Sequence, residues 1–108
     1  MPFSPNRSIP QRELTGGLQT IPNVAADLST VDTWIYQIVL ANKTGGAVTV
    51  TILDKAASPK TLLGAVSIAA NTTYVVAFPD GVKMTDGVNW VASAANSIDA
   101  EVFGTYRG

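Results

Sequence analysis

Residues 34–53 read WIYQIVLANKTGGAVTVTIL, and this stretch decides the fold class of the chain. Apolar residues alternate with their neighbours on both sides of a short connection, Asn42-Lys43-Thr44-Gly45-Gly46. Alternation with a period of two, many β-branched residues and a glycine-containing connection are typical of a β-hairpin. We therefore predict that residues 34–41 and 48–53 form two strands that pair directly through a short turn.

The chain beyond this stretch continues in the same style. Strand-like runs occupy residues 62–69, 72–78, 82–85, 88–94 and 98–106, and turn residues such as Pro79-Asp80-Gly81 and Asp86-Gly87 separate them. No segment shows the periodicity of an amphipathic helix. The sequence predicts an all-β domain over residues 32–108, a single antiparallel β-sandwich or jelly-roll-like domain of about seven strands.

The alternation also predicts which side of each strand faces the core. The expected core residues are Tyr36, Ile38, Leu40, Val48, Val50, Ile52, Val66, Ile68, Val76, Phe78, Trp90 and Val102. The opposite faces carry small, threonine-rich or apolar residues: Val39, Thr49, Thr51, Ala65, Ser67, Val75, Ala77, Val91, Ser93 and Phe103. A sheet face in water normally turns to clearly polar residues, so these faces favour contact with another protein surface.

Composition excludes several functions. Only 14% of the residues are charged and the net charge is −1, whereas about 25% is usual, which favours a chain that covers its surface with copies of itself. Cysteine and histidine are absent, so disulfides, thiolate or imidazole metal sites and Ser-His-Asp or Cys-His nucleophiles are excluded. The scattered basic residues form no stripe for nucleic acid. We expect no cofactor, no membrane span and no secretion signal.

Residues 1–31 differ from the rest. Four prolines and Gly16-Gly17 interrupt them, and their apolar residues come singly. Since proline removes a backbone donor and favours extended geometry, this segment is expected to be an extended arm. It is either a passive tail or an arm whose apolar residues contact a neighbouring subunit. The candidate contact residues are Phe3, Ile9, Leu14, Leu18, Ile21, Val24 and Leu28.

Three other groups could carry chemistry, and each has a plainer explanation. Asp80 and Asp86 could hold calcium, but turn chemistry accounts for both Asp-Gly pairs. Asp99 and Glu101 lie on one strand face, where an outward polar face explains them better than hydrolysis. Trp34 and Trp90 could stack on sugars, but a core or interface role is favoured, and the sequence assigns no catalytic or metal-binding residue.

The core of the chain resembles the small β-sandwich virion proteins of tailed bacteriophages. Three runs carry the resemblance: IVLANKTGGAVTVTILD at 38–54, SIAANTTYVVAFPDGVKMTDGVNWVASAAN at 67–96 and VFGTY at 102–106. Together they span roughly the last two thirds of the chain. The resemblance implies a head decoration protein, a cement protein or a tail component, present in many copies and without catalytic residues.

Two functions follow as expectations. The first is a non-enzymatic structural protein of the virion, assembled in the host cytoplasm, with the major capsid protein or tail proteins as partners and a homo-oligomer, a trimer, as its form. The second is a carbohydrate- or receptor-binding sandwich on a tail or fibre. Glycan recognition requires exposed aromatic and convergent polar groups in a concavity, whereas assembly requires buried sheet faces.

Overall fold

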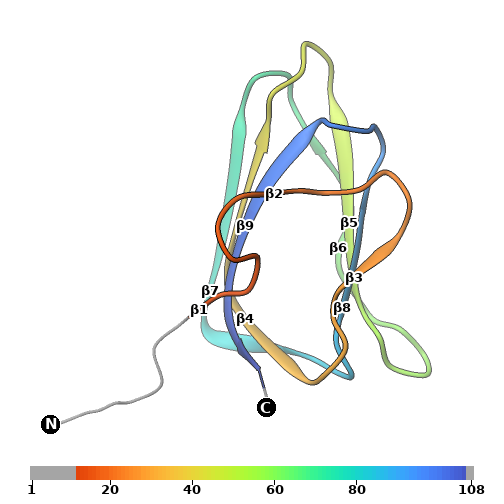
Figure 1. Cartoon of the computed structure of the whole chain (residues 1–108), viewed down its shortest axis with the longest axis vertical. Coiled ribbons are helices and arrows are strands. Elements are labelled where there is room, and N and C mark those ends of the chain that lie inside the picture. The colour runs from red at the N-terminus through yellow and green to blue at the C-terminus, as the bar shows by residue number, and fades with distance from the viewer. Residues whose placement is uncertain (1–11, 107–108) are drawn as a thin grey trace, which may run out of the picture.

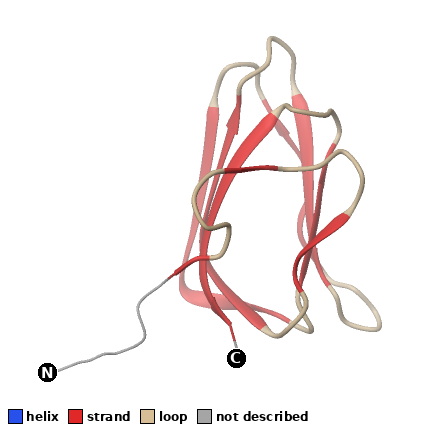
Figure 2. Cartoon of the chain, viewed as in Figure 1, coloured by secondary structure: helices blue, strands red, loops and turns tan. Residues whose placement is uncertain are grey.

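The computed structural model describes residues 12–106, which fold as strands and turns without a helix (Figure 2). No helix among these residues could therefore cross a membrane. The strands are β1 (Arg12–Glu13), β2 (Gln19–Thr20), β3 (Ala26–Ser29), β4 (Thr33–Asn42), β5 (Val48–Asp54), β6 (Thr61–Ile68), β7 (Thr73–Met84), β8 (Val88–Ala92) and β9 (Ile98–Tyr106).

These strands form two antiparallel sheets packed face to face (Figure 1). In the first sheet the order is β1-β9-β4-β7, with β2 also paired to β9, and in the second sheet it is β3-β8-β5-β6. The pairing is nested, because β2 meets β9, β3 meets β8, β4 meets β7 and β5 meets β6. This nesting is the strand order of a jelly roll. The prediction of an all-β sandwich is confirmed.

The connection after β4 differs from the predicted hairpin. β4 lies in the first sheet and β5 in the second, so the two strands do not pair and residues 43–47 cross from one sheet to the other. The prediction of direct pairing is therefore wrong. Gly45 and Gly46 do mark a reversal of the chain, but a reversal can join two strands within one sheet or carry the chain across the core. Strand alternation does not distinguish these outcomes, because each strand buries one face in both cases.

A bulge in β4 changes which residues face the core. The register with β7 shifts between Ile35 and Gln37, so that Ile35, Ile38 and Leu40 are fully buried whereas Tyr36 is half-buried. The prediction that Tyr36 belongs to the core is wrong, since one extra residue moves the alternation to the other face. The Tyr36 ring instead lies over Gly81, where a Cβ atom would come within 2.9 Å of it.

Pro79-Asp80-Gly81 does not reverse the chain as predicted. Residues 73–84 form one strand, β7, and the three turn residues bulge out of it opposite Tyr36. β7 is an edge strand, which is where a sheet tolerates proline. The predicted turn at Asp86-Gly87 is present, with φ values of 63° and 127°. A Cβ atom on Gly87 would lie 2.3 Å from the Ser29 carbonyl oxygen, so this position requires glycine.

Part of the predicted arm is built into the sandwich. Residues 12–29 contribute β1 and β2 to the first sheet and β3 to the second, and the chain crosses one side of the molecule between them (Figure 1). Backbone hydrogen bonds from Leu14 N to Val102 O at 2.7 Å and from Ile21 N to Ile98 O at 2.9 Å fix this crossing. A domain boundary at residue 32 is therefore wrong. Residues 1–11 of the predicted arm lie outside the described residues.

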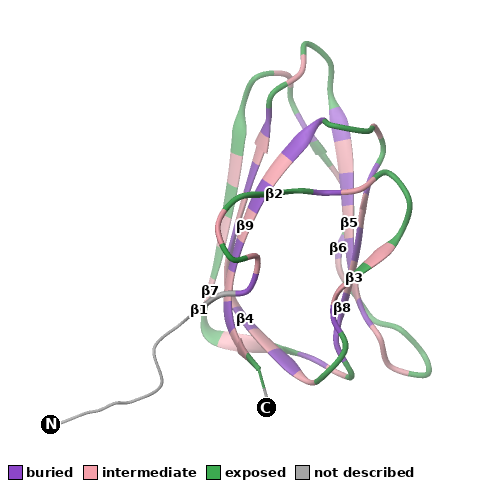
Figure 3. Ribbon diagram, in the orientation of Figure 1, coloured by how far each residue is buried: buried purple, intermediate pink, exposed green. Residues whose placement is uncertain are grey.

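The core fills the space between the sheets. Buried and half-buried residues alternate along the central strands, as Figure 3 shows for β4, β5 and β9. Trp90, at 1% exposure, is the largest fully buried side chain, which confirms its predicted place in the core. Val66, Val76 and Phe78 were predicted to be core residues, but they are half-buried, because β6 and β7 are edge strands.

Candidate interaction surfaces

The outer face of the first sheet is apolar on its β7 side. Val39 of β4 pairs with Val75 of β7, whose side chain is 54% exposed. In the next rung Gln37 lies between Ala77 and half-buried Phe103. Every residue that the sequence predicts on an outer face of either sheet is half-buried or exposed, so the predicted outward alternation is confirmed. Val39, Val75 and Ala77 thus form an apolar patch on the β7 side of this face, and Gln37 of β4 and Glu101 of β9, the partner of Val39, border it. No element among residues 12–106 covers the patch.

The outer face of the second sheet has a different chemistry. Thr49, Thr51, Ser67 and Ser93 lie there, and two hydroxyl groups bond to the backbone: Ser93 Oγ accepts from Thr49 N at 3.0 Å and Thr51 Oγ1 accepts from Ala65 N at 3.1 Å. The Thr51 contact satisfies an amide at the bulge of β6, and the Ser93 contact joins β5 to the residue that follows β8. The Thr51 and Ser93 hydroxyl groups therefore stabilise the sheet itself.

A cluster of charged and amide groups lies beside this face. Asp27 of β3 accepts hydrogen bonds from Lys55 Nζ and Asn89 Nδ2, each at 2.9 Å. The bond from Asn89 and the ammonium of Lys55 lower the pKa of the Asp27 carboxyl below its ordinary value. The cluster fixes the short strand β3 to β8 and β5, which is a structural role.

Trp34 lies at one end of the outer face of the first sheet. Its neighbour across the strands is Lys83, whose Nζ is 5.8 Å from the centre of the indole ring. The same Nζ lies 3.8 Å from Asp32 Oδ2. The indole is half-buried, with an ammonium against it, so it forms part of the outer face. Trp34 therefore differs from Trp90, which is inaccessible to any ligand.

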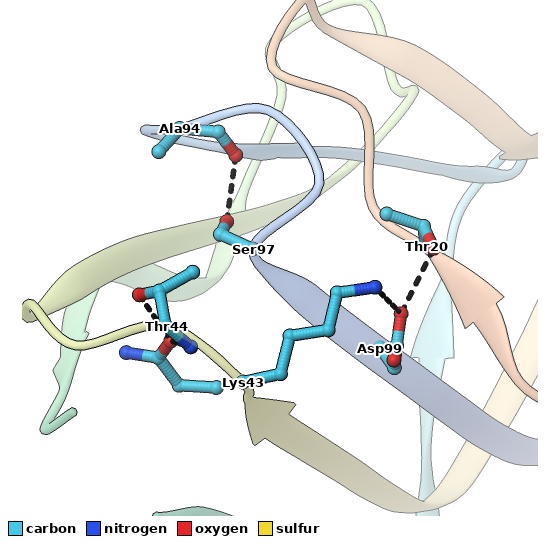
Figure 4. A network of polar contacts seen from close by, with 7 residues as sticks. Thr20, Lys43, Thr44, Ala94, Ser97 and Asp99 are labelled. Atoms are coloured by element: carbon cyan, nitrogen blue, oxygen red, sulfur yellow. Dashed lines mark hydrogen bonds and ion pairs between the residues drawn. The ribbon is translucent and has the colours of Figure 1, made fainter. Parts of the chain in front are cut away.

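A second polar network holds the opposite end of the sandwich together (Figure 4). Asp99 Oδ1 of β9 accepts hydrogen bonds from Thr20 Oγ1 at 2.8 Å and from Lys43 Nζ at 3.1 Å. Both donors lower the pKa of the Asp99 carboxyl, the Thr20 hydroxyl more than the Lys43 ammonium. Asp99 thereby fixes both β2, through Thr20, and the crossing after β4, through Lys43, to β9.

The acidic residues that the sequence singled out as candidate sites lie in β9, in the bulge of β7 and in the turn after β7. Asp99 and Glu101 do lie on one face of β9, but Asp99 is engaged by Thr20 and Lys43. Asp80 lies in the bulge of β7 and Asp86 in the next turn. Between residues 12 and 106 no three carboxylates gather at a metal-binding distance, and no pocket opens in the surface.

The candidate arm residues divide into three groups. Leu14 at 8% exposure and Ile21 at 0% are in the core of their own subunit, so the prediction that a partner buries them is wrong. Their spacing is sparse, but the two sheets supply the surface that they need. Leu28 is half-buried against the same core. Leu18 and Val24 are 71% and 72% exposed, and their contact with a partner stays a prediction, as it does for Phe3 and Ile9 outside the described residues.

The sequence analysis did not predict that β6 and β7 form an uncharged side of the molecule. No Asp, Glu, Lys or Arg occurs between Lys60 and Asp80, and this run contains β6, the following turn and the first half of β7. Because β6 and β7 are edge strands of different sheets, the uncharged run covers one lateral side of the sandwich. The absence of charge was visible in the sequence, but its concentration on one side depends on the strand order.

The fold and these surfaces define a jelly-roll protein whose described residues form no concave site. Comparisons with protein-family models, with curated proteins and with solved structures find no match.

Proposed function

We propose that this protein is a non-enzymatic structural protein of a bacteriophage virion, a decoration or cement protein held in the particle by protein–protein contacts. Its partners would be the major capsid protein or tail proteins, together with further copies of itself, and assembly would take place in the host cytoplasm. The observation that carries the proposal is the apolar β7 side of the outer face of the first sheet, where Val39 and Val75 lie side by side and Val75 is 54% exposed.

This face supports assembly because exposing apolar side chains to water is unfavourable, whereas burying them in an interface is stabilising. Burying one valine contributes about 1.5–3 kcal/mol, and exposed apolar patches on sheets mark contact sites. The strand order offers an analogy with viral capsid proteins, because they contain jelly rolls. Lectins and cupins contain jelly rolls as well. The surface chemistry favours the first of these uses, because a lectin site needs converging polar groups in a hollow.

A second function, glycan or receptor binding, has one observation in its favour. Trp34 lies on the outer face with Lys83 against its ring, and a partly exposed indole can stack on a sugar. Binding of this kind would leave Trp34 fluorescence sensitive to added oligosaccharide. Buried Trp90 would not respond, so the measurement reports on one site.

The test of the structural proposal is the composition of the particle. Mass spectrometry of purified tailed-phage particles, produced from the genome that encodes this chain, should find the protein in many copies per particle. A protein absent from the particles would overturn the proposal. A change of Trp34 fluorescence on binding a glycan from an oligosaccharide library would favour the alternative.

A further inference from the structure

The two sheets have four edges, and three of them are blunted. β1 and β2 are only 2 residues long each. β3 has a register shift beside Asp27, which is bonded to Lys55 and Asn89. β6 has two register shifts against β5, and Ala65 within it has a φ of 50°. Short strands, bulges and charges are the usual means of preventing edge-to-edge pairing.

The fourth edge, β7, lacks these features over residues 73–77. From Thr73 to Ala77 the register of β7 against β4 is unbroken, and this segment contains neither charge nor proline. Pro79, Asp80 and the bulge come only after it. Thr73–Ala77 is thus a strand segment of regular register at the open edge of a sheet, which is the template that strand addition requires.

The hydrogen-bond pattern shows which backbone groups face outward. Asn42 N donates to Thr72 O at 2.9 Å, so these opposed residues form a hydrogen-bonded pair of the β4–β7 ladder. Hydrogen-bonded and non-hydrogen-bonded pairs alternate in an antiparallel ladder. Tyr74 and Val76 therefore direct their N–H and C=O groups toward β4. Thr73, Val75 and Ala77 direct theirs away from it, to the free edge.

The surroundings of this edge are apolar. Half-buried side chains of the two edge strands, Leu62, Val66, Tyr74, Val76 and Phe78, close the side of the core between the sheets. Exposed and half-buried residues alternate along residues 73–78 of β7, the strand that Figure 3 draws in green and pink. A strand added to β7 would extend the apolar outer face and also cover part of this side.

We infer that residues 73–77 of β7 pair with the same residues of a second copy, antiparallel about a two-fold axis near Val75, so that the first sheets of two subunits form one continuous sheet. The outward groups of Thr73, Val75 and Ala77 would then bond to those of Ala77, Val75 and Thr73 in the second copy. Val75 of one copy would face Val75 of the second copy, and within each sheet Val39 would lie on the far side of Val75.

A second copy is the occupant that the charge distribution favours. On a two-fold axis each residue meets itself, so any charge near the axis would repel its own copy. The segment between Lys60 and Asp80 contains no such charge. Pairing of this kind makes a dimer the assembly unit, in place of the trimer expected from the sequence. The inference rests on the proposed function, since it names the contact through which copies of a structural protein associate.

Charge substitutions at residue 75 test the axis directly. Val75 is 54% exposed, so Val75→Lys and Val75→Glu should both fold. Each variant alone places like charges opposite each other, and the dissociation constant of the dimer measured by sedimentation velocity should rise by about tenfold or more. Mixing the two variants places opposite charges together, so the dimer should return as a heterodimer. This recovery requires residue 75 of one copy to face residue 75 of the other.

Val91→Lys is the matched control, because Val91 lies on the outer face of β8 in the second sheet, and this variant should dimerise as the wild type does. Circular dichroism confirms folding. Should Val75→Lys unfold, Ala77→Lys introduces a charge at another exposed position of the same edge.

A monomeric wild type at millimolar concentration would overturn the inference, as would unchanged association of Val75→Lys or no recovery on mixing. These results are separate from the particle composition, so a protein abundant in virions with an unaffected Val75→Lys variant would leave the proposed function standing.

Discussion

Asn42 connects the crossing between the sheets to the end of β6, 26 residues further along the chain. Its Nδ2 group donates to the carbonyl oxygens of Gly46 at 2.9 Å, Ile68 at 3.0 Å and Ala69 at 3.3 Å. Its Oδ1 atom accepts from both the backbone and the hydroxyl of Thr44. The side chain, only 3% exposed, thereby holds the crossing between the sheets against the end of β6.

Replacing Asn42 with alanine should destabilise the fold without changing the surface. Buried carbonyl oxygens would lose their donor, and each such loss costs about 1–3 kcal/mol. We expect Asn42→Ala to lower the free energy of unfolding by at least that amount in urea denaturation. Asn23→Ala, at an exposed position of the loop before β3, is the control and should stay within about 0.5 kcal/mol of the wild type. Equal effects of the two variants would contradict the role of Asn42.

Trp90 is the residue whose place the sequence predicted most directly. It alternates with Val88 and Ala92, and all three are buried at 1% exposure or less. Trp90→Ala leaves a large cavity between the sheets and should cost about 3–5 kcal/mol of unfolding free energy. Trp34→Ala, on the half-buried outer face, should cost clearly less in the same denaturation experiment. A Trp90→Ala midpoint equal to that of the wild type would contradict the buried position.

At the level of elements, local pattern predicted strands well and their partners poorly. Alternation is a property of one strand against one face, so it located residues 33–42 and 48–54 to within a few positions. Pairing depends on where the chain goes after a turn, and Gly45 and Gly46 permit either course. The bulges that moved Tyr36 outward and merged residues 73–84 into one strand depend on contacts between β4 and β7. No local signal contains those contacts.

The candidate surface was likewise predictable from local pattern only in part. The outward residues of the central strands, Val39 and Phe103 among them, followed from alternation and were found half-buried or exposed as predicted. The free edge at residues 73–77 did not follow, because an edge exists only once the strand order is known. Leu14 and Ile21 were assigned to a partner because their spacing is sparse, although a sandwich can bury single residues of a crossing segment.

The attachment of β2 should depend on pH through Asp99. The carboxylate accepts from Thr20 and Lys43, and its pKa in the folded protein lies below the ordinary value. A lowered folded pKa means that the stabilisation is complete above the unfolded pKa of about 3.9 and is lost as the pH falls through the folded pKa. Thermal unfolding between roughly pH 5 and pH 2 should therefore show a shallower loss of stability for Asp99→Asn than for the wild type.

Thr20→Val is the companion variant, since it removes the donor with the larger effect on the Asp99 pKa and keeps the carboxylate. Its acid transition should shift upward in pH toward that of an ordinary aspartate. At neutral pH both variants should change stability little, because the group is on the surface. Identical acid transitions in all three proteins would show that the contact at 2.8 Å does not affect folding.

At the scale of the whole molecule, charge is distributed unevenly. The ion pairs between Lys43 and Asp99, Lys55 and Asp27, and Lys83 and Asp32 all involve connections or strands outside residues 61–79. The lateral side formed by β6 and β7 has no charged residue between Lys60 and Asp80. A monomer that keeps its solubility by charge would not leave its longest regular edge neutral, so this distribution favours association through one side of the sandwich.

Deleting the N-terminal segment distinguishes the arm expected from the sequence from the strands that the structure shows. If residues 1–31 were only an arm, their deletion would leave the sandwich intact. The structure instead places β1, β2 and β3 in the sheets and Leu14 and Ile21 in the core. Loss of those two side chains removes about 1.5–3 kcal/mol each, and loss of β3 exposes the edge of β8 next to Trp90. Small domains have only about 5–15 kcal/mol of stability in total.

Deletion of residues 1–31 should therefore yield a protein that aggregates or unfolds without a cooperative transition in circular dichroism. Deletion of residues 1–11 keeps every described strand and is the control. A third variant, Ile21→Ala in the full chain, separates burial from strand loss and should lower the unfolding free energy by about 2–5 kcal/mol, since Ile21 is at 0% exposure. A soluble, cooperatively folded protein lacking residues 1–31 would mean that the sandwich closes without its first three strands, and would restore the arm as a separate element.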